Sequence, residues 1–265
     1  ARRIAQMPPK LWRSWRQYGA LTTVILVAKN FGVLVRNYFD GNIDRKYRIE
    51  TREFVPLGQL LIRSQNKEKG TNYEPTPERT FRKIMAHLPR SLENYSFVDF
   101  GCGKGRVLFY ANDWNFDRII GIEFAPELAA MAKQNCAILQ SHVGQRRIEV
   151  RCEDATETAL PQGPCVFYFF NPFNHEILAK VAARIRESYL ANPRKFYIVY
   201  YNLRDPGNAF EGMDILRVLA RGRYRFDLAA PRAYPFVIFE SRDPATVGEP
   251  APATRPTSST GAEAL

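Results

Sequence analysis

The chain has 265 residues, of which 45% are hydrophobic and 25% are charged, with a formal net charge of +11. This composition is that of an ordinary soluble globular chain rather than a disordered one, and the length predicts one main domain with additions. The four cysteines form no C-x-x-C pair and the three histidines are scattered, so we expect neither a disulfide framework nor a metal site. The cysteines are expected to be small buried side chains in a reducing, cytoplasmic compartment.

The first fifth of the chain is strongly basic. Residues 1–53 hold eleven Lys or Arg and four Asp or Glu, a net of +7. The apolar run from Ala20 to Ala28 is shorter than the roughly 20 residues that span a bilayer. The segment also lacks the small-residue cleavage pattern that would indicate a secretion signal. We predict a basic helical extension over residues 1–70. Packing on the main domain is its favoured role, and peripheral membrane contact through residues 10–38 or a nucleic-acid-binding arm are the alternatives.

Two segments lead toward the main domain. Residues 40–52 are polar and rich in turn formers. Further on, Tyr73-Glu74-Pro75-Thr76-Pro77 precedes a segment whose apolar residues recur at helical spacing. Thr76 is expected to be the N-cap of this helix and Pro77 its first residue.

The most informative stretch covers residues 97–110. An apolar run ends in Asp99, glycines follow at positions 101, 103 and 105, and a second apolar run begins. Glycines let a strand turn sharply into a helix and let a ligand approach the backbone. The N–H groups at the start of that helix then face the ligand. The spacing differs from the G-x-G-x-x-G pattern of dinucleotide-binding proteins.

Four further short apolar runs predict strands, and polar residues cluster at their carboxyl ends. Ligands of open α/β sheets bind at those ends. The acid Glu123 lies 18 positions after Gly105, close to the roughly 20 expected of a ribose-binding acid. The runs and the residues that close them are 119–123 with Glu123, 148–152 with Glu153 and Asp154, 165–170 with Asn171, and 196–201 with Asn202.

Taken together, residues 73–240 resemble the class I S-adenosylmethionine (SAM)-dependent methyltransferases. The resemblance implies an α/β fold with a seven-stranded, mostly parallel Rossmann-like sheet and helices on both faces. We expect this SAM-binding domain to cover residues 71–242. The remainder, residues 243–265, is rich in Pro, Ala, Thr and Ser and predicts a disordered tail.

The resemblance also implies the residues that bind the cofactor, S-adenosyl-L-methionine. The first motif would hold its methionine part and ribose, the acid of the second strand its ribose hydroxyls, and an acid after the third strand its adenine amino group. An aromatic-x-x-Thr segment ahead of the first motif often closes over SAM in this family. These expectations fall on Asp99, Gly101, Gly103 and Gly105, on Glu123, on Asp154 with Glu153 as the alternative, and on Tyr73 and Thr76.

The acceptor side is predicted at Asn171-Pro172-Phe173, which resembles the Asn/Asp-Pro-Pro-aromatic motif of the amino-methylating branches. There the Asn oxygen grips the target nitrogen and the aromatic ring stacks on a planar group. The second proline is absent here, which weakens the case for adenine or glutamine as the acceptor. A proline turn that merely ends a buried strand is the structural alternative. Asn171, Phe173 and Tyr201 are the predicted catalytic residues.

The predicted function is therefore methyl transfer from SAM to a nitrogen or oxygen acceptor. A protein lysine or a small molecule is favoured over nucleic acid. The chain is also similar to a branch of bacterial methyltransferases that carry an Arg-Lys-Tyr, a Tyr-Glu-Pro-Thr and an Asn-Pro-Phe segment. The alternative function is a SAM-fold protein that binds RNA or a membrane through its basic N-terminal region with little turnover.

Overall fold

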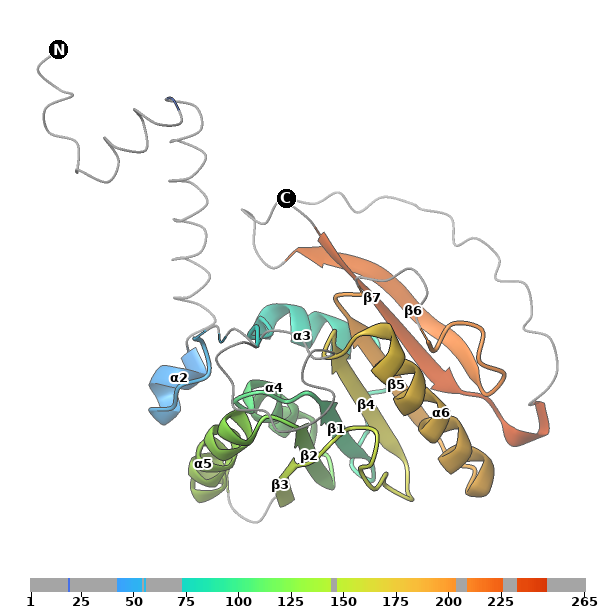
Figure 1. Cartoon of the computed structure of the whole chain (residues 1–265), viewed down its shortest axis with the longest axis horizontal. Coiled ribbons are helices and arrows are strands. Elements are labelled where there is room, and N and C mark those ends of the chain that lie inside the picture. Colours follow the sequence, from blue (N-terminus) through green and yellow to red (C-terminus); the bar gives the residue numbers. More distant parts are fainter. Residues whose placement is uncertain are drawn as a thin grey trace, which may run out of the picture.

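Figure 1 shows a computed structural model of the chain. Most of the predicted N-terminal extension, including residues 10–18 and 20–38, and the tail beyond residue 246 lie outside the part of the chain that the structure describes. The described residues are 19, 42–53, 55, 73–143, 147–203, 209–225 and 233–246.

A single seven-stranded sheet forms the centre of the described structure, in the order β3-β2-β1-β4-β5-β7-β6. Strands β1 to β5 pair in parallel, whereas β7 runs antiparallel to both β5 and β6. The predicted seven-stranded, mostly parallel sheet is confirmed. The strands are β1 (Ser96–Phe100), β2 (Arg118–Glu123), β3 (Arg147–Cys152), β4 (Cys165–Phe170), β5 (Phe196–Tyr201), β6 (Leu216–Arg225) and β7 (Ala233–Ser241).

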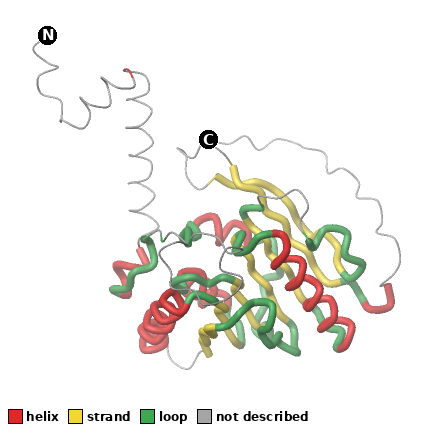
Figure 2. The backbone as a smooth tube through the Cα atoms, in the orientation of Figure 1, coloured by secondary structure: helices red, strands yellow, loops and turns green. Residues whose placement is uncertain are grey.

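Helices cover both faces of the sheet, as Figures 1 and 2 show. Strand residues alternate between two cores, because successive side chains of a strand point to opposite faces. In β4, Val166 and Tyr168 join the core of α3, α4 and α5, whereas Phe167 and Phe169 join the core of α6. The helices are α2 (Asn42–Tyr47), α3 (Glu78–Met85), α4 (Arg106–Ala111), α5 (Pro126–Val143) and α6 (His175–Ala191), with short 3-10 turns η4 (Asn112–Trp114) and η5 (Pro244–Thr246).

Helix α2 forms in the polar segment that the sequence marks as rich in turn formers. Ile43 and Tyr47 lie four positions apart, and both pack against the core of α3, α4 and α5. The Tyr47 ring centroid lies 5.5 Å from that of Phe109. Side chains four positions apart share one face of a helix, and this pair of contacts seats α2 on the domain.

Two local predictions need correction. Helix α3 begins at Glu78, its N-cap position is Pro77, and no side chain caps it, so Thr76 is not the N-cap. Thr76 is buried, and its backbone carbonyl oxygen accepts hydrogen bonds from Arg106 and Tyr110. Of the four cysteines, three are buried as expected, but Cys152 at the end of β3 is exposed.

The strand order reverses between β1 and β4, because the chain runs outward to β3 and then returns to pair β4 with the other side of β1. Such a switch point opens a crevice at the carboxyl ends of the strands, where ligands of α/β sheets bind. No helix in the described part of the chain is long and apolar enough to cross a membrane.

Candidate functional site

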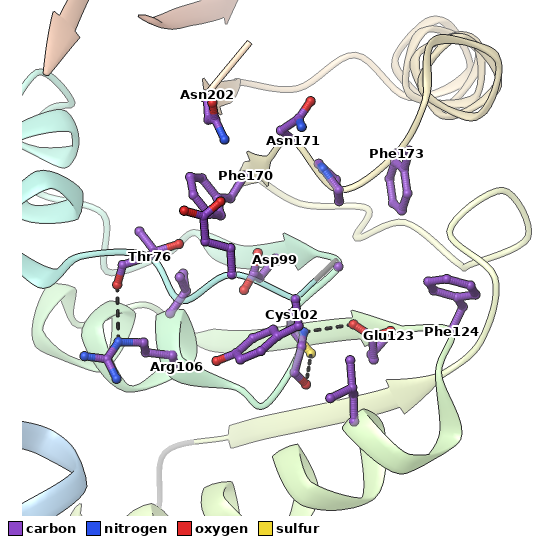
Figure 3. Close-up of a pocket in the computed structure, with 17 residues that line it drawn as sticks. Thr76, Asp99, Cys102, Arg106, Glu123, Phe124, Phe170, Asn171, Phe173 and Asn202 are labelled. Carbon is purple, nitrogen blue, oxygen red and sulfur yellow. Dashed lines mark hydrogen bonds between the residues drawn. The ribbon is translucent and has the colours of Figure 1, made fainter. Parts of the chain in front are cut away.

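A pocket lies at this crevice, among the residues that follow β1, β2, β4 and β5 (Figure 3). Eight of the predicted site residues line it. They are Tyr73, Thr76, Asp99, Gly101, Gly103, Glu123, Asn171 and Phe173. Three predicted site residues, Gly105, Asp154 and Tyr201, do not line it.

The first two glycines shape the floor of the pocket. Gly101 and Gly103 both have positive φ angles, +79° and +54°. A Cβ on Gly101 would lie 2.6 Å from the Cβ of Pro172, and one on Gly103 would lie 2.2 Å from the Tyr73 ring. Glycine is therefore required at both positions, for conformation and for space.

The third glycine has a different contact. Gly105 is the N-cap of α4 with φ +85°, and a Cβ there would lie 3.4 Å from Ala132 and 3.5 Å from Cys136 of α5. This spacing is ordinary to slightly tight packing, so Gly105 brings α4 close to α5. Its position supports the loop rather than the surface of the pocket.

Glu123 is held by the loop it faces. Its Oε2 accepts a hydrogen bond from the Gly103 N–H and its Oε1 accepts one from the Ala125 N–H, each at 2.9 Å. Burial raises the pKa of this carboxyl from 4.5 to about 7, although the backbone N–H donors lower it. A carboxylate has about four acceptor sites, so each oxygen can accept a further bond from a ligand hydroxyl.

Asp99 is buried, at 2% exposure, and lines the same pocket. Among the described residues, no group donates a hydrogen bond to its carboxylate. Burial, together with the nearby charge of Glu123, raises its pKa well above the usual value. A buried carboxylate without a partner is costly, and a cationic or hydrogen-bonding ligand in the pocket would relieve that cost.

Tyr73 covers the glycine loop from outside the sheet. Its hydroxyl donates a hydrogen bond to the Thr51 carbonyl oxygen at 2.6 Å, and the Lys104 ammonium lies 5.6 Å from its ring centroid. The Gly103 backbone lies against the same ring. Tyr73 thus links the loop to residues near position 51.

Asn171 and Phe173 line the pocket beyond β4, and both are buried. Tyr201 lies one layer behind, where its ring stacks on Phe170 with centroids 5.2 Å apart. Burial raises its pKa above the usual value for tyrosine. Asp154 lies in the loop after β3, where its Oδ1 accepts hydrogen bonds from the backbone N–H and the hydroxyl of Thr156.

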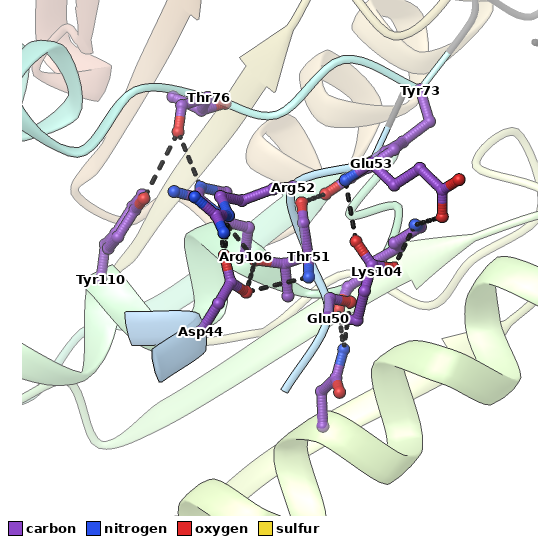
Figure 4. Close-up of polar contacts among 11 residues, drawn as sticks. Asp44, Glu50, Thr51, Arg52, Glu53, Tyr73, Thr76, Lys104, Arg106 and Tyr110 are labelled. Carbon is purple, nitrogen blue, oxygen red and sulfur yellow. Dashed lines mark hydrogen bonds and ion pairs between the residues drawn. The ribbon is translucent and has the colours of Figure 1, made fainter. Parts of the chain in front are cut away.

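Sequence reasoning missed the side chains that support the loop from behind (Figure 4). Arg106, the first residue of α4, donates to Asp44 at 3.0 Å and to the Thr51 hydroxyl at 2.8 Å, and its side chain is 3% exposed. Lys104, also buried, pairs with Glu50. Lys104 lies between the last two glycines of the motif and Arg106 follows the third. No local sequence pattern links either residue to the acids in residues 44–50.

The pocket also contains lining residues to which the sequence assigned no role in the site. Glu74 and Arg106 are charged, and Asn202 follows β5 as Asn171 follows β4. Pro172 lines the pocket within the predicted acceptor segment, and the remaining lining residues are Cys102, Val107, Phe124, Leu128 and Phe170.

Comparison with known proteins identifies the kind of domain that carries this pocket. Residues 97–189, about a third of the chain, match a family model described as "Methyltransferase domain". No curated protein sequence matches the chain.

Solved structures give likenesses of fold. One is the magnesium protoporphyrin IX methyltransferase of Synechocystis PCC 6803 with bound SAM, at 12% identity and a TM-score of 0.45, covering 80% of this chain and 97% of the other. Another is the ribosomal protein L11 methylase of Lactobacillus delbrueckii subsp. bulgaricus, at 14% identity and a TM-score of 0.45, covering 62% and 79%. At these values the likenesses assign no function.

The chain therefore carries a methyltransferase domain in its central region. It is a SAM-dependent methyltransferase, and S-adenosylmethionine is its cofactor. The site fits this cofactor in two respects. The glycine cradle has no room for a side chain, and the unpartnered Asp99 carboxylate faces the pocket.

Proposed function

We propose that this protein transfers a methyl group from SAM to a nitrogen or oxygen acceptor, with a protein lysine or a small molecule favoured over nucleic acid. The observation that carries the proposal is the convergence of Asp99, Glu123 and Asn171 on one pocket from three different strand ends. Two carboxylates suit a polar, positively charged cofactor, and the amide suits an acceptor that must be oriented. We assign the protein to a bacterial branch of methyltransferases that carries an Asn-Pro-Phe motif.

In this proposal the cofactor lies over the glycine loop, and its ribose lies beside Glu123, which the Gly103 N–H holds against the loop. Asp99, Gly101 and Gly103 hold its methionine part and ribose, and the Glu123 oxygens accept bonds from the ribose hydroxyls. Asp154 accepts from the adenine amino group, which requires a change in its loop because Asp154 does not line the pocket and its Oδ1 is held by Thr156. Gly105 supports the loop from α4.

Tyr73 and Thr76 close the cofactor end of the pocket. When bound, SAM supplies a methyl group on a positively charged sulfur, which an acceptor lone pair displaces in line. The protein's part is alignment and exclusion of water rather than covalent help. Asn171 orients the acceptor atom, Phe173 forms an apolar wall beside it, and Tyr201 stacks on Phe170, which also lines the pocket.

The remaining assignments follow from the same domain. Residues 71–242 form the catalytic domain, residues 1–70 an N-terminal extension, and residues 243–265 a tail. The extension supports the domain or the acceptor, and the ion pairs of Asp44 with Arg106 and of Glu50 with Lys104 support the first of these roles. We propose a cytoplasmic location.

Ligand binding tests the cofactor assignment directly. SAM or S-adenosylhomocysteine at 100 times its dissociation constant should stabilise the fold by about 2.7 kcal/mol, whereas NAD should give no thermal shift. Stabilisation by NAD with none by either SAM species would overturn the proposal.

Two substitutions sharpen this test. Asp99→Ala and Glu123→Ala should each weaken SAM binding roughly ten- to a hundredfold in calorimetry, as expected for a lost hydrogen bond to a charged partner. Circular dichroism should confirm that both variants remain folded. Unchanged SAM affinity in Glu123→Ala would show that this residue does not hold the ribose.

A further inference from the structure

Two asparagines occupy equivalent positions at the acceptor end of the pocket. Strands β4 and β5 pair in parallel with Phe170 opposite Tyr201, so Asn171 and Asn202 are the first residues beyond neighbouring strands. Both adopt positive φ angles, 44° for Asn171 and 60° for Asn202. Asparagine tolerates this conformation better than most residues with a side chain, so it can place a carboxamide at each of these turns.

The side chain of Asn202 has no partner within the described protein. The residue is 3% exposed and lines the pocket, and its backbone N–H donates to the Pro235 carbonyl oxygen at 2.9 Å. Among the described residues, no group hydrogen-bonds its carboxamide. Figure 3 shows this carboxamide pointing toward the pocket. An amide that lines the pocket and has no partner among the described residues is available to a bound group.

The charges of the pocket limit what that group can be. Glu74, Asp99 and Glu123 all line it. Among the described lining residues Arg106 alone is basic, and its guanidinium already binds Asp44, the Thr51 hydroxyl and the Thr76 carbonyl oxygen. A phosphate or carboxylate acceptor would find no available cation among these residues. A neutral or cationic acceptor fits the site.

We infer that Asn202 is a second acceptor-binding residue beside Asn171, and that together they select a primary amine. The inference rests on the proposed function and specifies its acceptor. A neutral primary amine carries two hydrogens and one lone pair. If each hydrogen donates to one asparagine Oδ1, the lone pair is left to face the methyl group. A hydroxyl or a secondary amine has one hydrogen and can satisfy only one of the two oxygens.

The transfer step balances with these groups. The amine first loses its extra proton to water at the mouth of the pocket. Its lone pair then forms the new N–C bond while the C–S bond breaks and its electron pair remains on sulfur. The methylated nitrogen is now cationic and releases one proton to water. Because the product has lost one N–H, it binds the two oxygens less well, and the pair of asparagines favours a single methylation.

The test is titration of the protein saturated with S-adenosylhomocysteine, using n-butylamine as probe and n-butanol as its hydroxyl control. Binding is followed by nitrogen-15 NMR of the side-chain amides. We expect n-butylamine to bind more tightly than n-butanol and to shift the Asn202 signal. In Asn202→Gly, which keeps the positive φ and removes the amide, affinity for n-butylamine should fall about five- to tenfold, the equivalent of one neutral hydrogen bond.

Two further variants separate the asparagine's role from its backbone strain. Asn202→Asp keeps an acceptor oxygen, so it should bind n-butylamine at least as tightly as the original chain. Asn115→Gly is the matched control, since Asn115 also has a positive φ, at 53°, but is exposed and does not line the pocket. It should leave n-butylamine binding unchanged.

The outcomes are distinct. Equal n-butylamine affinity in the original chain and Asn202→Gly, no n-butylamine binding, or n-butanol binding as tight as the amine would each overturn the inference. In all those cases S-adenosylhomocysteine still binds, and the proposed function stands. If S-adenosylhomocysteine does not bind the original chain, the proposed function fails and the inference fails with it.

Discussion

The two ends of the pocket use the same backbone conformation with different residues. At the cofactor end glycines adopt positive φ angles, and at the acceptor end asparagines do. The glycine positions have no room for a side chain, because a Cβ would lie within 2.6 Å of Pro172 or 2.2 Å of Tyr73. The asparagine positions carry side chains, and asparagine is the residue with a side chain that best tolerates this conformation. The difference indicates that the protein uses the side chains at one end and the bare backbone at the other.

The two ends of the pocket also differ in the side-chain contacts that support them. The glycine loop is backed by a buried ion pair of Arg106 with Asp44 and by a pair of the buried Lys104 with the half-exposed Glu50. The acceptor end is lined by the uncharged residues Asn171, Phe173 and Asn202 and by Phe170, on which the Tyr201 ring stacks. The cofactor end is therefore supported by ion pairs, and the acceptor end by aromatic packing.

The largest expected effect comes from removing this backing. Asp44→Ala would leave the Arg106 guanidinium buried without its anion, which typically costs about 3–5 kcal/mol of stability. Urea unfolding should show the loss. Glu211→Ala is the control, because its pair with Arg221 is exposed and should contribute less than about 1 kcal/mol. Similar losses in the two variants would show that the buried pair does not fix the cofactor end.

The next effect tests the glycine side of the comparison. Gly103→Ala adds φ strain of about 1–3 kcal/mol and also displaces the Tyr73 ring, so SAM affinity should fall by about 100-fold or more. Gly212→Ala is the matched control, since Gly212 has φ +77° but nothing within 4 Å of an added Cβ. Calorimetry should find SAM affinity unchanged there. Normal SAM affinity in Gly103→Ala would mean that the cofactor does not approach this backbone.

The asparagine side should respond in turnover rather than in cofactor binding. Asn171→Ala should lower turnover by up to about 100-fold while SAM affinity stays within a few fold, because the contact is made mainly in the transition state. Asn115→Ala controls for the strain of alanine at positive φ. A variant with normal turnover would reduce the Asn-Pro-Phe segment to a turn.

The sequence predicted the cofactor end of the pocket and the network behind it to different degrees. The strands and the glycine loop were predictable because their signals are local, an apolar run or a fixed spacing. The network behind the loop was not, because Asp44 and Arg106 lie 62 positions apart and neither residue belongs to a periodic pattern. Residues 42–47 looked like a turn, although the contacts of Ile43 and Tyr47 with the core make them a helix.

The acceptor end was predictable in part. The polar residues after each strand indicated Asn171 as a site residue. Asn202 was recognised as the polar residue that closes the run 196–201, but it was assigned no role. Their pairing depends on the register of β4 with β5, and their positive φ angles on the tertiary structure. Tyr201 was predicted because it ends the run 196–201, next to Asn202. Successive side chains of a strand point to opposite faces, however, and the Tyr201 ring packs behind Phe170.

The smallest expected effect concerns pH and the carboxylates of the cofactor end. Burial raises the pKa of Glu123 from 4.5 to about 7, so the folded protein holds this proton more tightly than the unfolded chain does. Its contribution to stability is therefore greatest at low pH and is lost as the pH rises from 4.5 through about 7. The raised pKa of Asp99 adds to the same trend.

SAM binding should depend on pH with the opposite sign. Ribose hydroxyls donate to the ionised Glu123 carboxylate, so the complex favours loss of the proton, and SAM affinity should rise with pH and level off above about 7. Below that point the affinity should fall by at most about tenfold per pH unit for this single group. Calorimetric titrations on both sides of neutrality would measure this slope. Glu123→Gln cannot titrate, so it should remove the Glu123 part and leave the part due to Asp99. An identical slope in the original chain and in Glu123→Gln would assign the pH dependence to Asp99 and remove Glu123 from the ribose site. The side chains of Asn171 and Asn202 do not titrate, so the acceptor end should add no pH dependence of its own in this range.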